Sequence, residues 1–456
     1  MSGLTASLGR FLADFGASAL PDEAVAIAKT GFLDFVATLL AGRAQESVQI
    51  VRRLCPAGDE ATLLWGAHRA SARDAALVNG MAGHVLDYDD VALLGHPSTV
   101  LVPAILAEAQ RLNASGAQAL RAYVLGYEVW AELAWREPDP YHVKGWHATS
   151  MFGTVAAAGA LAALNGLDAD KARNALAIAS SLASGLVANF GTMTKAYHAG
   201  NAAARAIDAL RLACAGFTSA PDALEHHAGF LSAISPHGRV DRDSPAEALG
   251  SRLRILEQRL SIKKYPVCYC AHRAIDGVID LVRNHDLAAQ EIERVDVTLS
   301  ATQIAILRNA APENALEAKF SLEFGVAAAL IARAVGRAQL VDAFVMRPDV
   351  RALFGRVHKH EAQALCPVYV GLSLNERVRI EMKDGRRFDS GDIRFARGHA
   401  EFPLAPGEHA AKFLDCAAGV EGLDGRALLQ QLTCLETLPS VRALAAAGAT
   451  PGVHHV

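Results

Sequence analysis

The stretch GWHATSMFGTVAAAGALAALNGL, residues 145–167, sets a histidine and two hydroxyl groups in front of a helix made of small residues. A helix start exposes backbone N–H groups that no carbonyl accepts, and these carry a partial positive charge. His147, Thr149 and Ser150 therefore stand where an anion would bind. Because alanine and glycine let helix axes come close together, the stretch predicts a buried helix whose start forms an anion site.

The same arrangement recurs at TMTKAYH, residues 192–198, which precedes an alanine-rich run at residues 199–215. That run is also typical of a helix packed closely on its neighbours. Lys195 near a helix start opposes the helix dipole, which favours a role in holding an anion over a purely structural role. Two cationic helix starts in one chain indicate a carboxylate-binding pocket.

Length and composition bound the fold and its partners. A chain of 456 residues exceeds what one hydrophobic core usually covers, so we expect two domains. The net charge of -4 creates no strong field for polyanions, and we expect no nucleic-acid partner. The seven cysteines are an odd number among mostly apolar neighbours, which indicates reduced thiols in the cytoplasm.

The pattern of apolar residues gives no membrane-targeting signal. Residues 1–10 lack a charged region followed by a long apolar run, so no secretory signal is expected. The low-charge stretches at residues 151–167 and 174–193 are rich in small residues such as alanine and glycine, and asparagines interrupt them. They are therefore predicted to be core helices, and no membrane partner is expected.

Helical periodicity comes first along the chain. Apolar residues recur at three- and four-residue spacing from Leu4 to about Glu225, with breaks at Pro56, residues 95–97 and Pro138. This part is predicted to be a helical bundle.

Strand signals appear only after Lys263. Residues 292–299 and 378–382 alternate apolar and polar side chains, as strands do. The second run ends on KDGR at residues 383–386, whose Asp-Gly pair suits a hairpin turn. Helical patterning returns from about Glu408 to Ala446, in segments such as 411–417 and 427–435.

We therefore predict a mainly α fold, in which a large all-helical domain is interrupted by a smaller α+β domain. The helical domain comprises residues 1–262, and C-terminal helices at residues 401–456 rejoin it. Residues 263–400 form the α+β domain.

Several motifs together resemble the MmgE/PrpD family. They are LDYDD at residues 86–90, GHPST at 95–99, GWHATS at 145–150, KAYHAGNAA at 195–203, and KKYP at 263–266 with His272. The resemblance covers nearly the whole chain, and the order of the motifs makes it specific. It implies a large helical domain with a smaller lid domain, usually in a homodimer. It also implies an enzyme that acts on a small di- or tricarboxylate without a cofactor, as 2-methylcitrate dehydratases, cis-aconitate decarboxylases and an iminodisuccinate epimerase do.

The residue types in these motifs suit that chemistry. Removal of a proton next to a carboxylate builds negative charge, so an enzyme needs a base and fixed cations nearby. The resemblance implies a catalytic set of Asp90, His96, His147, Lys195 and Lys263. The residues expected to bind substrate are Thr99, Thr149, His198, Lys264 and Tyr265.

Position and context separate these candidates. Lys263 and Lys264 lie where the periodicity changes, and pockets favour domain junctions. One of the two is expected to be a solvated lysine, and Lys263 matches the family lysine better. A lone histidine is more often structural than catalytic, so the case for His96 and His147 depends on the register of the motifs. Asp87 and Asp89 are expected to orient their segment or to bind a neighbouring histidine, not to act as acids.

The reaction itself stays open at this point. A dehydratase removes an α-proton and expels a β-hydroxyl, an epimerase needs a proton donor on each face, and a decarboxylase protonates carbon as carbon dioxide leaves. Family frequency favours dehydration first, with epimerisation second and decarboxylation a further alternative. The segment KKYPVC at residues 263–268 departs from the methylcitrate-dehydratase branch, which argues against methylcitrate as the substrate.

Three other interpretations fit less well. The segment DYDD at residues 87–90 resembles the magnesium motif of terpene cyclases, but it lacks tryptophan or phenylalanine around it and a second acidic metal motif is not found. Cys268 and Cys270 do not have the spacing of an iron–sulfur cluster. A non-catalytic helical scaffold would not require histidines and lysines at helix starts. We therefore expect no metal and no cofactor.

Overall fold

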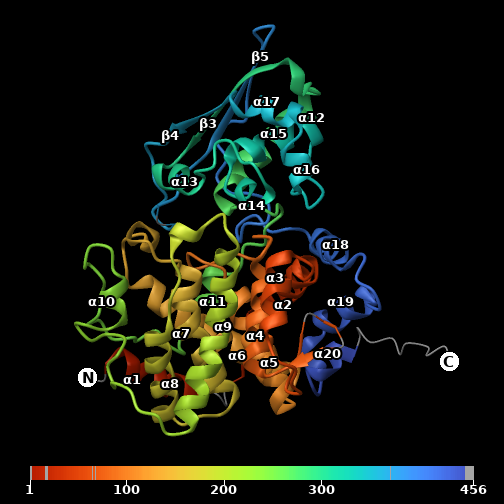
Figure 1. The fold of residues 1–456 in the computed structure, drawn as a ribbon. Helices are drawn as coiled ribbons and strands as arrows, with labels where there is room; N and C mark the ends of the chain where they lie inside the picture. Colours follow the sequence, from red (N-terminus) through yellow and green to blue (C-terminus); the bar gives the residue numbers. More distant parts are fainter. Residues whose placement is uncertain (1–2, 16–18, 64, 67, 370, 447–456) are drawn as a thin grey trace, which may run out of the picture. The chain divides into compact units, whose positions relative to one another are not determined.

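Helices dominate the part of the chain that the structure, a computed structural model, describes: residues 3–15, 19–63, 65, 66, 68–369 and 371–446 (Figure 1). The prediction of a mainly α fold is confirmed. The chain divides into two units, each with its own core. The first comprises residues 1–188, 194–260 and 405–456, and the second residues 189–193 and 261–404.

The first unit is helical and contains one small two-stranded sheet among its described residues. Its breaks fall at the predicted positions, since one helix ends at Leu54, one begins at Ser98 and one ends at Trp135. Its elements are α1 (Leu4–Asp14), α2 (Asp22–Gly42), α3 (Glu46–Leu54), β1 (Ala61–Thr62), β2 (Arg69–Ala70), α4 (Ala72–His84), α5 (Ser98–Leu112), α6 (Gly116–Trp135), α7 (Ala148–Leu164), α8 (Ala169–Leu182), α9 (Met193–Cys214), α10 (Phe230–Ile234), α11 (Arg254–Gln258), α18 (Pro406–Ala417), α19 (Gly425–Thr433) and α20 (Arg442–Ala446).

Small residues bring the helices of the first unit close together, as the sequence predicts. A Cβ atom built on Gly200 of α9 would overlap the carbonyl of Leu77 in α4. Gly153 of α7 similarly lies against the side chain of Val100 in α5. This close packing brings the end of α4 and the start of α9 together, and both carry polar side chains of the candidate site.

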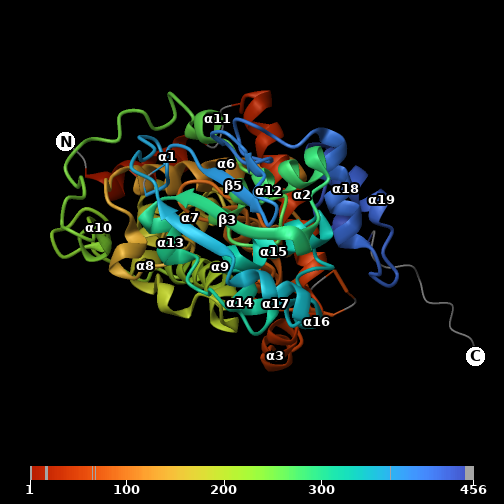
Figure 2. The same cartoon turned by 90° about the horizontal axis from the view of Figure 1, so that it is seen from above.

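The C-terminal helices α18 and α19 lie beside α2, as both views show (Figures 1 and 2). Helix α2 is long and apolar enough to cross a membrane, but 67% of its most apolar window is buried inside the fold. Asp34 of α2 is fully buried and forms an ion pair with Lys412 of α18. These contacts make α2 a core helix of the first unit.

The second unit contains a four-stranded sheet among its described residues, in the order β4-β3-β5-β6. β3 runs parallel to β4 and antiparallel to β5, which pairs with β6. The helices pack on one face of the sheet (Figure 1). The core of this unit includes Ile275, Val295, Leu330 and Ile380. Its elements are α12 (His272–His285), β3 (Ile292–Leu299), α13 (Ala301–Ile306), α14 (Ala315–Ala318), α15 (Leu322–Ala332), α16 (Asp342–Val345), α17 (Pro348–Phe354), β4 (Val357–Glu361), β5 (Arg377–Met382) and β6 (Arg387–Asp389).

Two details of the sequence prediction change in the structure. The predicted strands correspond to β3 and β5, and the Asp-Gly turn joins β5 to β6, but β4 was not predicted because VHKHE lacks strong alternation. Helix α9 begins at Met193, so Lys195 lies inside its first turn and not in front of it.

Candidate functional site

The loop between α4 and α5 supplies most of the candidate site. His84 is the last residue of α4, and Asp87 follows in a left-handed conformation with φ of 51°. Aspartate tolerates this conformation better than most residues because its short side chain bonds locally. Leu93 and Leu94 also have positive φ, an uncommon and costly conformation for leucine. These turns lead the chain to His96, just before α5.

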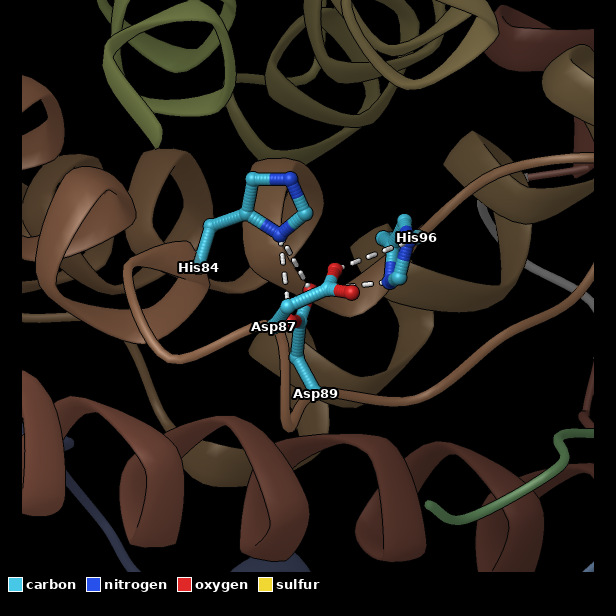
Figure 3. Close-up of side chains that lie close together, drawn as sticks. All are labelled: His84, Asp87, Asp89 and His96. Carbon is cyan, nitrogen blue, oxygen red and sulfur yellow. Dashed lines mark hydrogen bonds and ion pairs between the residues drawn. The ribbon is translucent and has the colours of Figure 1, made fainter. Parts of the chain in front are cut away.

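Asp89 lies between two imidazoles (Figure 3). Its carboxylate is 2.9 Å from Nδ1 of His84 and 3.2 Å from Nδ1 of His96. Asp89 is fully buried, whereas His96 keeps 13% of its side chain exposed. His96 is thus the member of this trio that solvent can reach.

Asp87 joins the trio to a lysine. Its Oδ1 accepts a hydrogen bond from Nζ of Lys195 and lies 3.7 Å from Nε2 of His96 (Figure 3). Both carboxylate and ammonium are buried. Residues from α4, its following loop and α9 therefore form one charged network.

Two more histidines adjoin this network. Nδ1 of His147 lies 3.2 Å from Nδ1 of His198, and the His147 ring stacks on His84 with centroids 5.8 Å apart. His147 precedes α7, whose first helical residue is Ala148, as the sequence predicts. The first unit therefore gathers His84, His96, His147 and His198 around Lys195.

Burial and the Lys195 charge lower the pKa values of His84, His147 and His198. Burial lowers the pKa of His84 to about 3 against the opposing charge of Asp89. Burial and Lys195 lower the pKa of His198 to about 4 and hold that of His147 well below its usual value. The pKa of Asp89 stays well below its usual value, because His84 and His96 outweigh the cost of its burial. The site thus presents His84, His147 and His198 as neutral imidazoles beside the Asp89 carboxylate and the Lys195 ammonium group.

Asp90, placed in the catalytic set by the resemblance, points to a different environment. Ser98 donates to its Oδ2 at 2.8 Å, and Ser98 also lies 2.7 Å from the hydroxyl of Tyr123. Burial and the charges of Asp34 and Asp89 raise the pKa of Asp90 well above its usual value. Asp87, and not Asp90, is the aspartate that contacts both Lys195 and His96, while a catalytic role for Asp90 stays a prediction.

The two threonines have different surroundings. Thr99 donates to the carbonyl of Gly80 at 3.2 Å, a contact that holds α5 on α4. The hydroxyl of Thr149 is buried in the first turn of α7 and has no hydrogen-bond partner among the described residues. Substrate binding stays a prediction for both threonines.

Lys412 supports the aspartate loop from α18. Its ammonium group lies 2.6 Å from Oδ1 of Asp34 and donates to the carbonyl of Tyr88 at 2.8 Å. Tyr88 stands between Asp87 and Asp89, so this contact fixes the backbone that aims both carboxylates. Lys412 and Tyr88 are 324 residues apart in sequence, and no local pattern predicts their contact.

The remaining predicted residues belong to the second unit. Lys263 is fully buried and Lys264 is half-buried. Tyr265 donates its hydroxyl hydrogen bond to Asp276, and burial followed by the Asp276 charge raises the pKa of the phenol. Tyr265 thus has a partner in its own unit. The catalytic role of Lys263 and the substrate-binding roles of Lys264 and Tyr265 stay predictions.

Comparisons with known proteins agree with the motifs. Residues 6–243 match the MmgE/PrpD N-terminal domain, and residues 265–436 match the MmgE/PrpD C-terminal domain. The chain is 29% identical to the cis-aconitate decarboxylase of Mus musculus over 80% of its own length and 74% of the relative. It is 29% identical to that of Homo sapiens over 74% and 71% of the two chains. A cis-aconitate decarboxylase of Aspergillus terreus is 25% identical over 84% and 83%.

Proposed function

The chain belongs to the MmgE/PrpD family, and from that premise we propose that it is a cofactor-independent lyase that decarboxylates a small unsaturated tricarboxylate such as cis-aconitate. The observation that carries the proposal is the similarity to cis-aconitate decarboxylases over most of the chain. Family frequency alone favoured dehydration, and these relatives move decarboxylation ahead of it. The gathered histidines and Lys195 support a reaction on a polycarboxylate.

The reaction needs no electron acceptor outside the substrate. When the carboxylate on the saturated carbon leaves as carbon dioxide, the electron pair of the broken carbon–carbon bond enters the allylic system. A proton then adds to the vinylic carbon at the far end, and the double bond shifts. The product is a dicarboxylate with a terminal methylene group.

The residues of the first unit fit the three tasks of this reaction. Lys195 would hold a retained carboxylate and stabilise the charge that spreads onto it in the transition state. His96, the partly exposed imidazole between Asp87 and Asp89, would deliver the proton to carbon. The neutral His147 and His198 would donate hydrogen bonds to substrate oxygens without adding positive charge. The leaving carboxylate would thus face the less cationic side of the site.

The direct test is proton NMR in D₂O with a panel of cis-aconitate, citrate and 2-methylcitrate, together with a measurement of released carbon dioxide. Decarboxylation predicts carbon dioxide and a methylene product that carries one deuterium where the vinylic carbon was protonated. A new vinyl signal from citrate or 2-methylcitrate without carbon dioxide would instead indicate dehydration. Deuterium exchange without net conversion would indicate an epimerase.

A variant pair tests the role of Lys195. Lys195→Met removes the proposed carboxylate cation, so kcat/KM should fall by roughly 10²–10³-fold. Lys171→Met is the control, because Lys171 is exposed and its ion pair is with Asp168 at the start of its own helix. An unchanged rate in Lys195→Met would reject the proposed role.

A further inference from the structure

The loop after α4 places four potential metal ligands together: His84, Asp87, Asp89 and His96 (Figure 3). Each side chain offers one ligand atom, and these atoms all lie within 4.8 Å of one another. We propose that a divalent transition-metal ion such as Zn²⁺ binds these four side chains and thereby inhibits the enzyme. The inhibition rests on the proposed function, whereas the binding does not.

The spacing of the ligand atoms fits a tetrahedral ion. With metal–ligand bonds of about 2.0–2.2 Å, neighbouring ligands of a tetrahedron lie about 3.3–3.6 Å apart. Nδ1 of His84 and Nδ1 of His96 lie 2.9 Å and 3.2 Å from the Asp89 carboxylate, and the four ligand atoms, one from each residue, all lie within 4.8 Å of one another. Small shifts of these side chains would therefore complete the coordination.

The contact between His96 and Asp89 gives a second indication. Nδ1 of His96 is buried and makes no hydrogen bond to any described residue, although Oδ2 of Asp89 is 3.2 Å away. The two atoms are close but poorly aligned for a hydrogen bond. Such an arrangement suits two atoms that share a cation.

The donor set selects the kind of ion. Two imidazole nitrogens and two carboxylate oxygens suit Zn²⁺ or Co²⁺, whereas Mg²⁺ and Ca²⁺ prefer oxygen ligands alone. In the structure the ammonium group of Lys195 already neutralises Asp87. An incoming ion must therefore compete with Lys195 for that carboxylate.

This competition explains why a bound ion would inhibit. The ion would occupy Asp87 and His96, the proposed proton donor, and its charge would repel Lys195 from the substrate carboxylate. Substrate and metal should thus exclude each other. The enzyme would therefore be active without a metal ion and would be inhibited when one binds.

Binding is measured with Co²⁺ on the full chain, through its visible absorption in a tetrahedral site, and with Zn²⁺ by calorimetry. One tight site per chain is expected for the wild type. Asp89→Asn should weaken binding by more than the roughly 10–100-fold that loss of an outer-shell partner causes. His96→Ala, at a partly exposed position, gives the same test if Asp89→Asn does not fold.

Lys195→Met provides the sharpest test, because it removes the competing positive charge. It should bind Co²⁺ at least about tenfold more tightly while it loses activity. The controls His227→Ala and His455→Ala each break one of the two adjacent histidine pairs of the sequence, His226-His227 and His454-His455. They should leave the Co²⁺ spectrum unchanged.

Three results would overturn the inference: no tetrahedral Co²⁺ spectrum, a spectrum lost in His227→Ala or His455→Ala, or a Lys195→Met variant that binds no more tightly. With cis-aconitate as substrate, Zn²⁺ should inhibit, and added substrate should lower the apparent Zn²⁺ affinity. If Co²⁺ binds but no decarboxylation is detected, the proposed function is rejected and the metal site is supported. If saturating Zn²⁺ leaves the rate of decarboxylation unchanged, the proposed inhibition is rejected.

Discussion

Adjacent aspartates in one short motif have opposite surroundings. Asp87 contacts Lys195 and His96, and Asp89 contacts two imidazoles, whereas Asp90 points to the hydroxyl of Ser98. His84 and His96 hold the pKa of Asp89 well below its usual value, burial holds that of Asp90 well above it, and Asp87 forms an ion pair with Lys195. A motif of identical side chains thus divides into a charged part and a neutral part.

This division predicts different results for two similar variants. Asp87→Asn removes the charge that holds Lys195 and His96, so kcat/KM should fall by about 10²-fold or more. Asp90→Asn replaces a neutral carboxyl by a neutral amide that can still accept from Ser98, so the rate should change by only a few-fold. Steady-state kinetics on both variants make the comparison. Equal losses in the two would contradict the assignment of Asp87.

The neutral His198 predicts a pH dependence of stability. Folding lowers the pKa of His198 from 6.5 to about 4, because burial and the Lys195 charge disfavour the protonated imidazole. Nδ1 of His147 also lies 3.2 Å from Nδ1 of His198. Below pH 6.5 His198 becomes protonated in the unfolded chain, whereas in the folded chain it becomes protonated only near pH 4. Stability from this group is therefore full above pH 6.5 and is lost as the pH falls toward 4.

Urea unfolding at pH 7.5, 6.0 and 5.0 measures the effect. The wild type should lose stability toward pH 5, and His198→Gln should lose less over the same range. The matched control His226→Gln changes an exposed histidine and should follow the wild type. A parallel decline in His198→Gln would show that other groups cause the dependence.

At the scale of the elements, the site depends on how helices far apart in sequence meet. The end of α4, the start of α7 and the first turn of α9 each contribute side chains. Gly200 allows α9 to approach α4, and α18 supports the intervening loop through Lys412. The position of each functional group is therefore set by helix packing as well as by its own segment.

Two ion pairs between α2 and the C-terminal region allow a matched test. Lys412→Met removes the ammonium group that pairs with the fully buried Asp34 and leaves its carboxylate 3.4 Å from Nε2 of His409, so the free energy of unfolding should fall by about 3–5 kcal/mol. Lys29→Met breaks the exposed pair with Glu436 and should cost less than about 1 kcal/mol. Denaturant unfolding compares the two variants. A similar loss in the free energy of unfolding for the two variants would show that the buried ion pair stabilises the fold no more than the exposed one.

At the scale of the whole molecule, the chain leaves the helical unit and returns to it after a long insertion. Residues 261–404 have their own core, which includes Ile275, Val295, Leu330 and Ile380. The helical unit instead needs residues 405–446 to cover α2 and to pair Asp34.

This organisation predicts that the two parts respond differently to excision. A fragment of residues 261–404 should unfold cooperatively, because its sheet and helices share one core. A chain that ends at residue 404 should be poorly soluble, because it exposes the apolar face of α2 and leaves Asp34 without Lys412. Circular dichroism melts and the soluble fraction after expression measure both. A fragment without a cooperative transition would contradict the first expectation.

The sequence by itself determined the features that depend on neighbouring residues. Periodicity and small side chains predict the helices, alternation predicts β3 and β5, and the helix start at His147 follows from local chemistry. The motifs also identify the family and most of the histidines and lysines of the site. Such signals are local because backbone conformation and helix starts depend on a few consecutive residues.

Only the tertiary structure decided which aspartate faces the cluster, that His84 joins it, and that Lys412 supports it. Left-handed backbone conformations at Asp87, Leu93 and Leu94 set the path of the loop, and residue type alone does not predict them. The contact of Lys412 with Tyr88 exists only because α18 packs beside α2. Side chains that are equivalent in the sequence acquire different roles through long-range packing, because their burial and the charges near them differ only once the helices pack together.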